Sequence, residues 1–289
     1  MLGSNLAGCT PSSETEVSSY NLMEEVGKYR KIDTHIHTNL FSSSNPEVLI
    51  EYADRLGVER MIISRPITEG PATPEECIKF NNMILDAMKK FPDRFMGQFT
   101  INPRYQKESF EEIKRCVDLG MVGLKVYHQV KISDPLFYPI VEKFIDLKMM
   151  ILMHAECQLG IAGYRMKYDE KVRPNASIPE DFVEIAKRYP EAMFQFAHIG
   201  GGGDWEYECK ILKDYPNIYV DTSGSNNEEN MIDFAISYLG EDRLFFASDN
   251  SFYQSVGKIL ASNITEAQKR KIFFENYNNI LRKGGHHVA

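Results

Sequence analysis

Short apolar runs rich in β-branched and aromatic residues alternate with longer amphipathic stretches from residue 30 onward. Such runs are typical of β-strands, and the stretches between them have the spacing of apolar positions that favours helices. Eight runs can be counted, at residues 31–38, 60–66, 95–103, 122–128, 150–156, 193–201, 218–224 and 243–250. They recur about every 30 residues, the length of one βα unit. The pattern therefore predicts eight consecutive βα units.

Helix start and stop signals fall between these runs, as such units require. The pairs Asn45-Pro46 and Thr73-Pro74 each place a capping side chain before a proline at the first helical position. Gly57 closes the first periodic stretch, where a glycine can adopt the backbone conformation that ends a helix. These signals support the division into strands and helices.

Eight evenly spaced βα units predict an α/β fold of the (β/α)8 TIM-barrel type. The length of 289 residues allows either two domains or one barrel, and we expect a single barrel domain over residues 29–289 after a polar N-terminal tail at 1–28. An open doubly wound sheet uses the same βα order and is the alternative. The sequence lacks the dinucleotide-binding glycine pattern, which favours the closed barrel.

Composition restricts the partners of the chain. The formal net charge is −8, and no Lys/Arg run forms a basic patch that would override it, so we expect no nucleic-acid partner. No apolar run reaches the roughly 18 residues of a membrane span. The five cysteines are scattered without CxxC spacing, which argues against a disulfide framework or a thiolate zinc site. A small-molecule substrate is therefore expected, and a homo-oligomer is compatible with the sequence.

The N-terminal tail bears on localisation. Residues 6–9, Leu-Ala-Gly-Cys, resemble the lipobox of bacterial lipoproteins, but the five residues before them supply neither a basic start nor an apolar stretch. We expect a cytoplasmic protein. The alternative is an exported lipoprotein anchored at Cys9, which requires an upstream signal that this sequence lacks.

Four of the seven histidines lie at or near the C-terminal ends of predicted strands: His35, His37, His154 and His198. Side chains alternate along a strand, so His35 and His37 point to the same side, together with Asp33. Two nitrogens on one face can hold a metal ion. Taken alone, this pair could equally well be two buried histidines that hydrogen-bond to their neighbours and bind no metal. Short metal-binding motifs occur often by chance.

The last predicted strand adds a carboxylate to this face of the barrel. Asp249 ends the run at 243–250, which neighbours the first run in a closed barrel. A carboxylate that points into an apolar barrel mouth is costly unless it is paired or bound to a cation. Together with the histidines at the other strand ends, Asp249 predicts a metal site.

These residues resemble the amidohydrolase superfamily, particularly the metal-dependent TIM-barrel hydrolases and decarboxylases of amidohydrolase family 2. The resemblance spans about residues 30–283 and follows the order of the family's motifs. It rests on DTHIH (33–37), GLK (123–125), MHAE (153–156), AHIGG (197–201) and SD (248–249). The chain departs from many relatives in having FASDN where they have a glycine before SD and a proline soon after.

The resemblance implies that His35, His37, His154 and Asp249 bind one divalent metal ion, with His198 over the open side of the site. Three imidazoles and a carboxylate suit Zn²⁺, and Mn²⁺ and Fe²⁺ are alternatives. Such an ion lowers the pKa of a bound water towards about 7. Asp249 and His198 are then the catalytic residues: Asp249 accepts and returns a proton, and His198 polarises the substrate carbonyl.

This chemistry leads to three hypotheses about function. The first is a metal-dependent hydrolase of an amide, lactone or ester in a small, carboxylated substrate. The second is a non-oxidative decarboxylase or hydratase on the same metal site. The third is a TatD-like nuclease or a non-catalytic binding relative, against which the negative charge and the intact ligand set count.

Two basic residues are predicted to bind the substrate. Lys125 lies on the fourth predicted strand, where binuclear members of the superfamily carry a carboxylated lysine between two metals; we instead expect one metal and a lysine that pairs with a carboxylate or an anionic substrate. Arg165 lies on the long segment after the fifth strand, where a guanidinium could recognise a carboxylate or remain solvated. Arg65, Arg104 and Arg173 are placed on similar loops.

Overall fold

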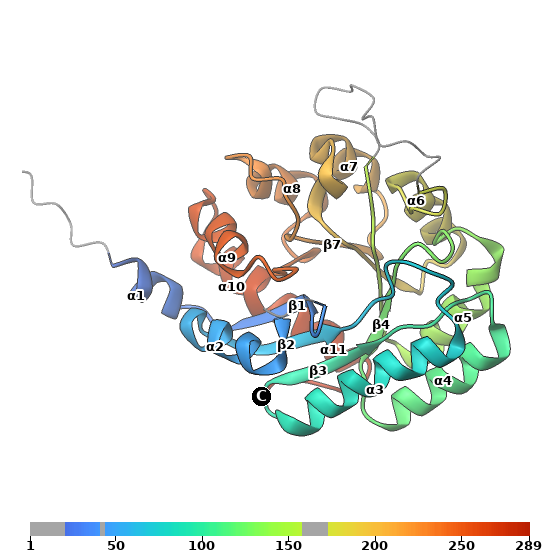
Figure 1. Ribbon diagram of the computed structural model, residues 1–289. Coiled ribbons are helices and arrows are strands. Elements are labelled where there is room, and N and C mark those ends of the chain that lie inside the picture. Colours follow the sequence, from blue (N-terminus) through green and yellow to red (C-terminus); the bar gives the residue numbers. More distant parts are fainter. Residues whose placement is uncertain (1–20, 41–43, 158–172) are drawn as a thin grey trace, which may run out of the picture.

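The computed structural model describes residues 21–40, 44–157 and 173–289, and its centre is an eight-stranded parallel sheet surrounded by helices (Figure 1). The strands are β1 (Lys31–His37), β2 (Val58–Ser64), β3 (Phe95–Phe99), β4 (Gly123–Val126), β5 (Met150–Met153), β6 (Met193–Phe196), β7 (Ile218–Asp221) and β8 (Leu244–Phe245). Each strand pairs in parallel with the next, in the order β1 to β8. This order confirms the TIM barrel, because a doubly wound sheet would change direction partway across.

The ends of the sheet meet through the segment that follows β8. The backbone N–H of Thr34 donates to the carbonyl of Phe246 at 3.1 Å, and the N–H of Asp249 donates to the carbonyl of His35 at 2.8 Å. The chain after β8 therefore lies beside β1 and completes the barrel. Asp249 is fixed next to the histidines of β1 by this contact.

Helices begin and end close to where the sequence signals place them. The side chain of Asn45 accepts from the backbone of α2, whose first residue is Pro46, and Thr73 forms a capping box with Glu76 at the start of α3. Gly57 ends α2 with a φ of 64°. The α-helices are α1 (Leu22–Gly27), α2 (Pro46–Leu56), α3 (Pro74–Lys90), α4 (Gln106–Asp118), α5 (Tyr138–Leu147), α6 (Pro179–Arg188), α7 (Trp205–Leu212), α8 (Met231–Leu239), α9 (Phe252–Ala261), α10 (Glu266–Arg270) and α11 (Asn276–Lys283). The 3-10 turns η2 (Pro135–Phe137) and η4 (Ile199–Gly202) and the π-helical turn η5 (Lys271–Glu275) complete the described elements.

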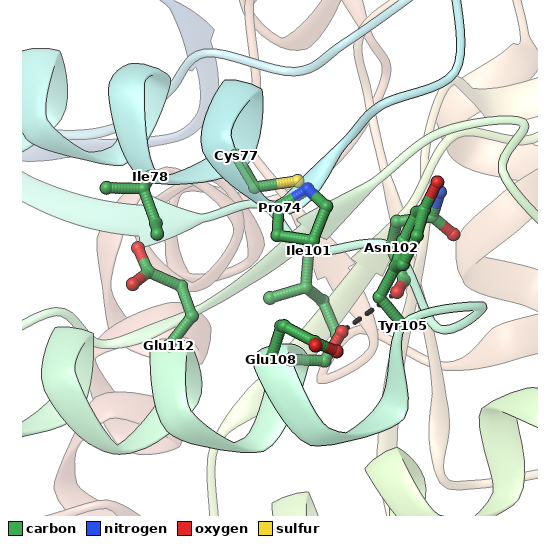
Figure 2. Close-up of a pocket in the computed structure, with 9 residues that line it drawn as sticks. Pro74, Cys77, Ile78, Ile101, Asn102, Tyr105, Glu108 and Glu112 are labelled. Carbon is green, nitrogen blue, oxygen red and sulfur yellow. Dashed lines mark hydrogen bonds between the residues drawn. The ribbon is translucent and has the colours of Figure 1, made fainter.

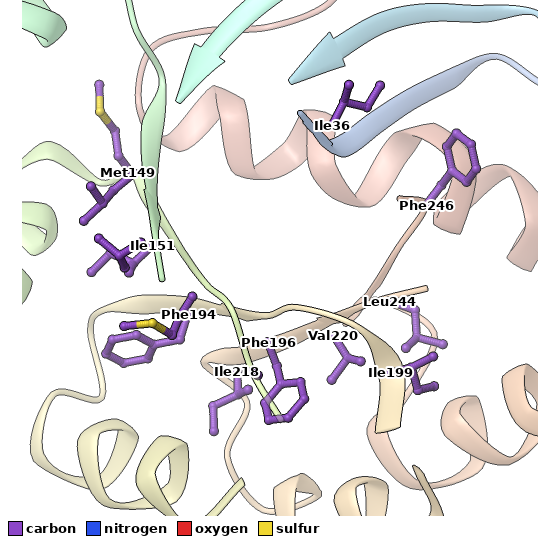
Figure 3. Close-up of a cluster of buried hydrophobic side chains, with 14 of the residues drawn as sticks. Ile36, Met149, Ile151, Phe194, Phe196, Ile199, Ile218, Val220, Leu244 and Phe246 are labelled. Atoms are coloured by element: carbon purple, nitrogen blue, oxygen red, sulfur yellow. The ribbon is translucent and has the colours of Figure 1, made fainter. Parts of the chain in front are cut away.

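The apolar core has two parts. A large cluster lies between the strands and the surrounding helices, and Figure 3 shows members of it from β5 to β8, among them Ile151, Phe194 and Val220. A smaller cluster collects residues near the beginnings of strands, such as Ile32 and Met150, against α11. The apolar filling of the barrel therefore concentrates near the strand beginnings, which leaves the opposite end for polar groups.

The strands are shorter than the predicted runs at this opposite end. The run at 193–201, for example, continues as a strand only to Phe196, and His198 then takes a φ of 69°. The residues after the strands leave the sheet with their polar side chains, so they form the loops on which TIM barrels carry their sites.

The N-terminal segment, expected to be a polar tail, contains a helix: residues 22–27 form α1, because Asn21 caps the helix and Val26 packs into the core. Residues 1–20, with Cys9, lie outside the described residues. Across residues 21–40, 44–157 and 173–289, no helix has the length and apolar character needed to cross a membrane.

Candidate metal centre

The histidines of β1 and the aspartate after β8 converge at the C-terminal end of the barrel. His35 Nε2 lies 3.2 Å from His37 Nε2, and Asp249 Oδ1 lies 3.7 Å and 3.2 Å from these two nitrogens. Both imidazoles are buried, and the Asp249 side chain is partly exposed. The two histidines and Asp249 therefore offer ligand atoms within 4.8 Å of one another, as a metal site requires.

The protonation of His35 follows from its partner on β7. His35 Nδ1 lies 3.0 Å from Asp221 Oδ2, and both side chains are fully buried. Burial opposes ionisation of Asp221, but its interaction with His35 holds the pKa of this carboxyl far below its ordinary value. An ionised carboxylate only accepts hydrogen bonds, so Nδ1 carries the proton. His35 Nε2 consequently presents a lone pair to the centre.

His37 is held in the same way by β2. Its Nδ1 lies 3.0 Å from Ser64 Oγ, and this hydroxyl donates its own hydrogen to the carbonyl of Ile36 at 3.3 Å. Ser64 Oγ can therefore only accept from Nδ1–H, and His37 Nε2 also presents a lone pair. Burial lowers the pKa of His37 well below its usual value, which keeps this imidazole neutral.

The donor set fits a bound cation. Two imidazole lone pairs and a carboxylate oxygen face one another across 3.2–3.7 Å, and the protons of both rings are committed to Asp221 and Ser64. Three acceptors without a shared proton repel one another, whereas a divalent ion between them satisfies all three. The hydrogen bonds at Nδ1 also fix the orientation of both rings, as is typical of metal-ligating histidines.

His198 and His154 form the other side of the centre. Ser223 Oγ donates to Asp221 Oδ1 at 2.6 Å and so accepts from His198 Nδ1 at 2.8 Å, which directs His198 Nε2 towards His154 Nδ1 at 3.2 Å. His154 therefore contacts His198, which lies between it and the group formed by His35, His37 and Asp249. His154 itself groups within 4.8 Å with His128 and Glu156, not with His35, His37 and Asp249. Its assignment as a metal ligand stays a prediction, as does the placing of His198 over the open side.

The turn that carries Asp249 is strained and firmly held. Asp249 and Asn250 have φ values of 45° and 67°, a region in which each non-glycine residue costs about 1–3 kcal/mol. The Asn250 side chain accepts from the backbone N–H of His37 and donates to its carbonyl, at 2.9 and 2.8 Å. Asp33 Oδ1 accepts from the backbone N–H of Ser248 at 3.0 Å. These bonds to β1 fix the position of the Asp249 carboxylate.

The pKa values agree with a cation site made of neutral imidazoles. Burial lowers the pKa of His154 well below its ordinary value and that of His198 to about 4. Burial opposes ionisation of Asp249 as well, but the neighbouring His35 and His37 bring its pKa below the usual value. At neutral pH the centre therefore offers imidazole lone pairs and a negative oxygen.

A cavity of about 310 Å³ opens beside this centre, large enough for a small molecule. Its lining consists of His154, Ala155, Glu156, Arg173, His198, Gly201, Gly202, Gly224, Ser225 and Asp249. Arg173 donates to Glu156 at 2.6 Å at this cavity. The pocket between α3 and α4 in Figure 2 has about 10 Å³, room for no more than a water molecule, and it is not a substrate site.

The two predicted substrate-binding residues have different outcomes. Lys125 lies fully buried on β4, and its Nζ has no hydrogen-bond partner among the described residues. Burial lowers the pKa of His37, His154 and His198, and the positive charge of the nearby Lys125 adds to this effect. Arg165 lies outside the described residues, and its role stays a prediction.

Sequence analysis missed the residues that orient the histidines. Asp221 is the last residue of β7 and lies within the run at 218–224, so a polar side chain at a strand end was an available signal. It accepts from His35, from the backbone and hydroxyl of Ser223, from the backbone of His198 and from Gln195. Ser64 gave no signal, because a serine that ends an apolar strand is common.

Comparison with known proteins agrees with the barrel fold. The sequence profile of a family described as amidohydrolase matches residues 32–276. Gamma-resorcylate decarboxylase from Rhizobium sp. (strain MTP-10005) is 24% identical over 286 residues, which cover 82% of this chain and 86% of that protein. 2-Amino-3-carboxymuconate-6-semialdehyde decarboxylase from Dictyostelium discoideum is 21% identical over 259 residues, which cover 78% and 71%.

Solved structures have the same fold. A 2,6-dihydroxybenzoate decarboxylase in complex with 2,6-dihydroxybenzoate superimposes with a TM-score of 0.69 at 18% identity, covering 88% of this chain and 99% of that one. A dihydroxybenzoic acid decarboxylase from Polaromonas sp. JS666, with bound manganese and the inhibitor 2-nitroresorcinol, has a TM-score of 0.66 at 19% identity, covering 88% and 97%.

Proposed function

This chain belongs to the amidohydrolase family, and from that premise we propose that it is a metal-dependent decarboxylase of a small carboxylic acid. The observation that carries the proposal is the convergence of His35, His37 and Asp249, whose three acceptor atoms lie 3.2–3.7 Å from one another. The curated relatives described above are decarboxylases that match over most of this chain. They favour a decarboxylase over the metal-dependent hydrolase that was the first expectation from the sequence.

The proposed metal ligands are His35, His37, His154 and Asp249. When bound, a divalent ion supplies a positive charge that binds the substrate's oxygens and stabilises negative charge in the transition state. Zinc suits the imidazole-rich donor set, and the manganese bound to the Polaromonas structure makes this ion an equal candidate. One ion per chain is proposed.

Decarboxylation breaks a C–C bond, releases CO₂ and leaves an electron pair on carbon, which must then take up a proton. His198 is the proposed proton carrier: Ser223 holds its Nδ1, so Nε2, which lies 3.2 Å from His154 Nδ1, is the nitrogen that takes and delivers the proton. Its pKa of about 4 favours the neutral ring, and a bound carboxylate would raise that pKa. Asp249, whose Oδ2 lies 3.8 Å from His198 Nδ1, is the second group at which a proton can be held.

The substrate must stabilise the electron pair that CO₂ leaves behind. An aromatic or unsaturated acid does so by delocalisation, and the decarboxylases named above act on such acids. A single ring fits a cavity of about 310 Å³. We therefore propose an aromatic or conjugated carboxylic acid as the substrate class.

The test uses purified protein stripped of metal by a chelator and reloaded with either zinc or manganese. A panel of hydroxybenzoates, lactones and amides is supplied, and CO₂ release and hydrolysis are measured separately. We expect CO₂ release from at least one acid, dependent on the metal and absent in His37→Ala. Metal-dependent hydrolysis of a lactone or amide without CO₂ release would contradict the proposal and restore the hydrolase hypothesis.

A further inference from the structure

Glu208 places a carboxyl group where the helix α7, in the outer layer of helices (Figure 1), otherwise carries apolar side chains. The buried face of α7 consists of Trp205, Glu208, Cys209 and Leu212, and Glu208 is fully buried. This spacing is that of the apolar stripe of a helix, in which a carboxyl group costs free energy of folding unless it has a partner. Glu208 takes no part in the proton transfer proposed above. Its place in the stripe therefore has another cause.

The partner of Glu208 is the backbone of the loop that follows β6. Glu208 Oε2 accepts a hydrogen bond from the backbone N–H of Gly200, which is buried, and Oε1 has no partner in the described part of the chain. Gly200 has a φ of 81°, and a Cβ added there would lie 2.8 Å from the Cβ of Trp205. Only glycine brings the backbone so close to α7. The carboxyl group thus provides an acceptor for a backbone N–H that is buried against the helix.

The same loop determines the position of His198. The backbone of His198 has a φ of 69°, a left-handed conformation that a non-glycine residue keeps only where its surroundings hold it. Its N–H donates to Asp221 Oδ1 at 3.0 Å, and its carbonyl accepts from the N–H of Gly201 at 2.6 Å. Asp221 therefore holds the chain at His198, and Glu208 holds it two residues later.

The loop also forms one wall of the cavity. Gly201 and Gly202 line the cavity together with His198. The carbonyl of Gly201 accepts from the backbone N–H of Cys157 at 3.2 Å, which ties the loop to the segment after β5. A shift of the backbone at Gly200 would therefore move the imidazole of His198 and, to a smaller extent, this wall.

We propose that Glu208 is a positioning residue for His198 and acts through its hydrogen bond to Gly200, without contact with the substrate. The inference rests on the proposed function, in which His198 carries the proton. Burial raises the pKa of Glu208 well above its ordinary value, and the charge of Asp221 adds to this effect, so Glu208 is a neutral acid at neutral pH. A neutral group suits this place, because a second buried negative charge would repel the ionised Asp221.

A purely structural role is the competing explanation. In that role Glu208 only attaches α7 to the barrel, and its loss lowers stability without a specific effect on His198. Glu112 on α4 is the matched control, because it is also a buried glutamate on an outer helix, where it accepts from Asn81 at 2.8 Å and from Arg115 at 2.7 Å. Glu112 does not belong to the described lining of the cavity.

The experiment compares Glu208→Leu, which removes the acceptor, with Glu208→Gln, which keeps an uncharged acceptor oxygen, and with Glu112→Leu. The acid that the wild type decarboxylates is the substrate. We expect kcat to fall about 10- to 100-fold in Glu208→Leu, since a displacement of about 1 Å at a reacting group has an effect of this size. KM should change less than kcat, and metal affinity should stay within a few fold of wild type. Glu208→Gln should keep most of kcat, and Glu112→Leu should lose stability but not kcat.

A second readout does not depend on activity. In metal-free protein labelled with ¹⁵N-histidine, the ring signals of His198 are identified by their absence in His198→Asn. These signals should move in Glu208→Leu and keep their wild-type positions in Glu208→Gln and Glu112→Leu. If Glu208→Leu does not fold, Glu208→Met, which keeps a long side chain without an acceptor oxygen, takes its place.

The outcomes separate this inference from the proposed function. Unmoved His198 signals in Glu208→Leu would overturn the inference, as would an equal loss of kcat in Glu112→Leu or in Glu208→Gln. If the wild type releases CO₂ from no acid of the panel while the His198 signals move in Glu208→Leu alone, the inference holds and the proposed function is wrong. CO₂ release by the wild type, with unmoved His198 signals in Glu208→Leu, would refute the inference and keep the proposed function.

Discussion

Replacing Asp221 by asparagine should damage the metal centre although Asp221 is not a proposed ligand. Its Oδ2 accepts from His35 Nδ1 and Gln195 Nε2, both at 3.0 Å, and its Oδ1 accepts three hydrogen bonds from His198 and Ser223. An asparagine that keeps Oδ1 as the acceptor turns an N–H₂ group towards His35 and Gln195. Two hydrogen bonds to a charged acceptor, at about 1.5–3 kcal/mol each, are then lost, a decrease of about 3–6 kcal/mol in the free energy of unfolding.

The same change acts on metal affinity through His35. Without the carboxylate, the proton of His35 is no longer held at Nδ1, and the tautomer with a proton on Nε2 cannot bind an ion through that nitrogen. We expect metal affinity to fall by about 10- to 100-fold in Asp221→Asn. Denaturant unfolding of the metal-free protein measures the first effect, and titration with Mn²⁺ or Zn²⁺ measures the second.

Ser223→Ala is the matched control for this prediction. Ser223 also donates to Asp221, but its other contact is with His198 Nδ1, and it does not touch His35. This variant should keep metal affinity within a few fold of wild type while turnover falls. Wild-type metal affinity in Asp221→Asn would refute the reasoning, because it would mean that the buried carboxylate does not determine the tautomer of His35.

Other predictions test ligands, catalyst and stoichiometry. Elemental analysis of protein prepared without chelators should give about one divalent ion per chain, and two ions lost together in Lys125→Ala would contradict a mononuclear site. His37→Ala should lose metal, activity and part of its thermal stability together, because metal binding contributes to the stability of the folded state. His198→Asn should keep its metal while kcat falls by about 10²–10³, and loss of the ion there would make His198 a ligand. Asp249→Asn should nearly abolish turnover, and full activity in that variant would show that Asp249 is structural.

The barrel could be predicted because its determinants are local. Each βα unit has its own apolar run and its own capping residues, such as Asn45 and Thr73, and eight repetitions at one spacing allow few arrangements. Strand ends were less predictable: β8 keeps only Leu244–Phe245 of the run at 243–250. An apolar run continues through the residues that leave the sheet, because the loops at the barrel mouth are also buried.

The site could be predicted only in part, for a physical reason. His35, His37 and Asp249 were identified because a polar side chain at the end of a buried strand is conspicuous. The contacts that orient these side chains are longer in range: Asp221 on β7 contacts His35 on β1, 186 positions away in the sequence. The pattern of apolar and polar positions along the sequence does not indicate which distant residues come into contact. Such a contact depends on the tilt and closure of eight strands, which only coordinates provide.

The two roles proposed for Asp249, metal ligand and proton carrier, are compatible with the different partners of its two oxygens. Oδ1 lies 3.2 Å from His37 Nε2, within the donor set for the ion, whereas Oδ2 lies 3.8 Å from the ring of His198. A carboxylate that lay wholly inside the donor set would have no oxygen left for proton transfer, and one that lay wholly outside could not bind the ion. The left-handed backbone at Asp249 and Asn250 produces the intermediate position, and the bonds of Asn250 to His37 maintain it. The left-handed backbone of this turn therefore places one oxygen of Asp249 near each of the two partners that the proposed roles require.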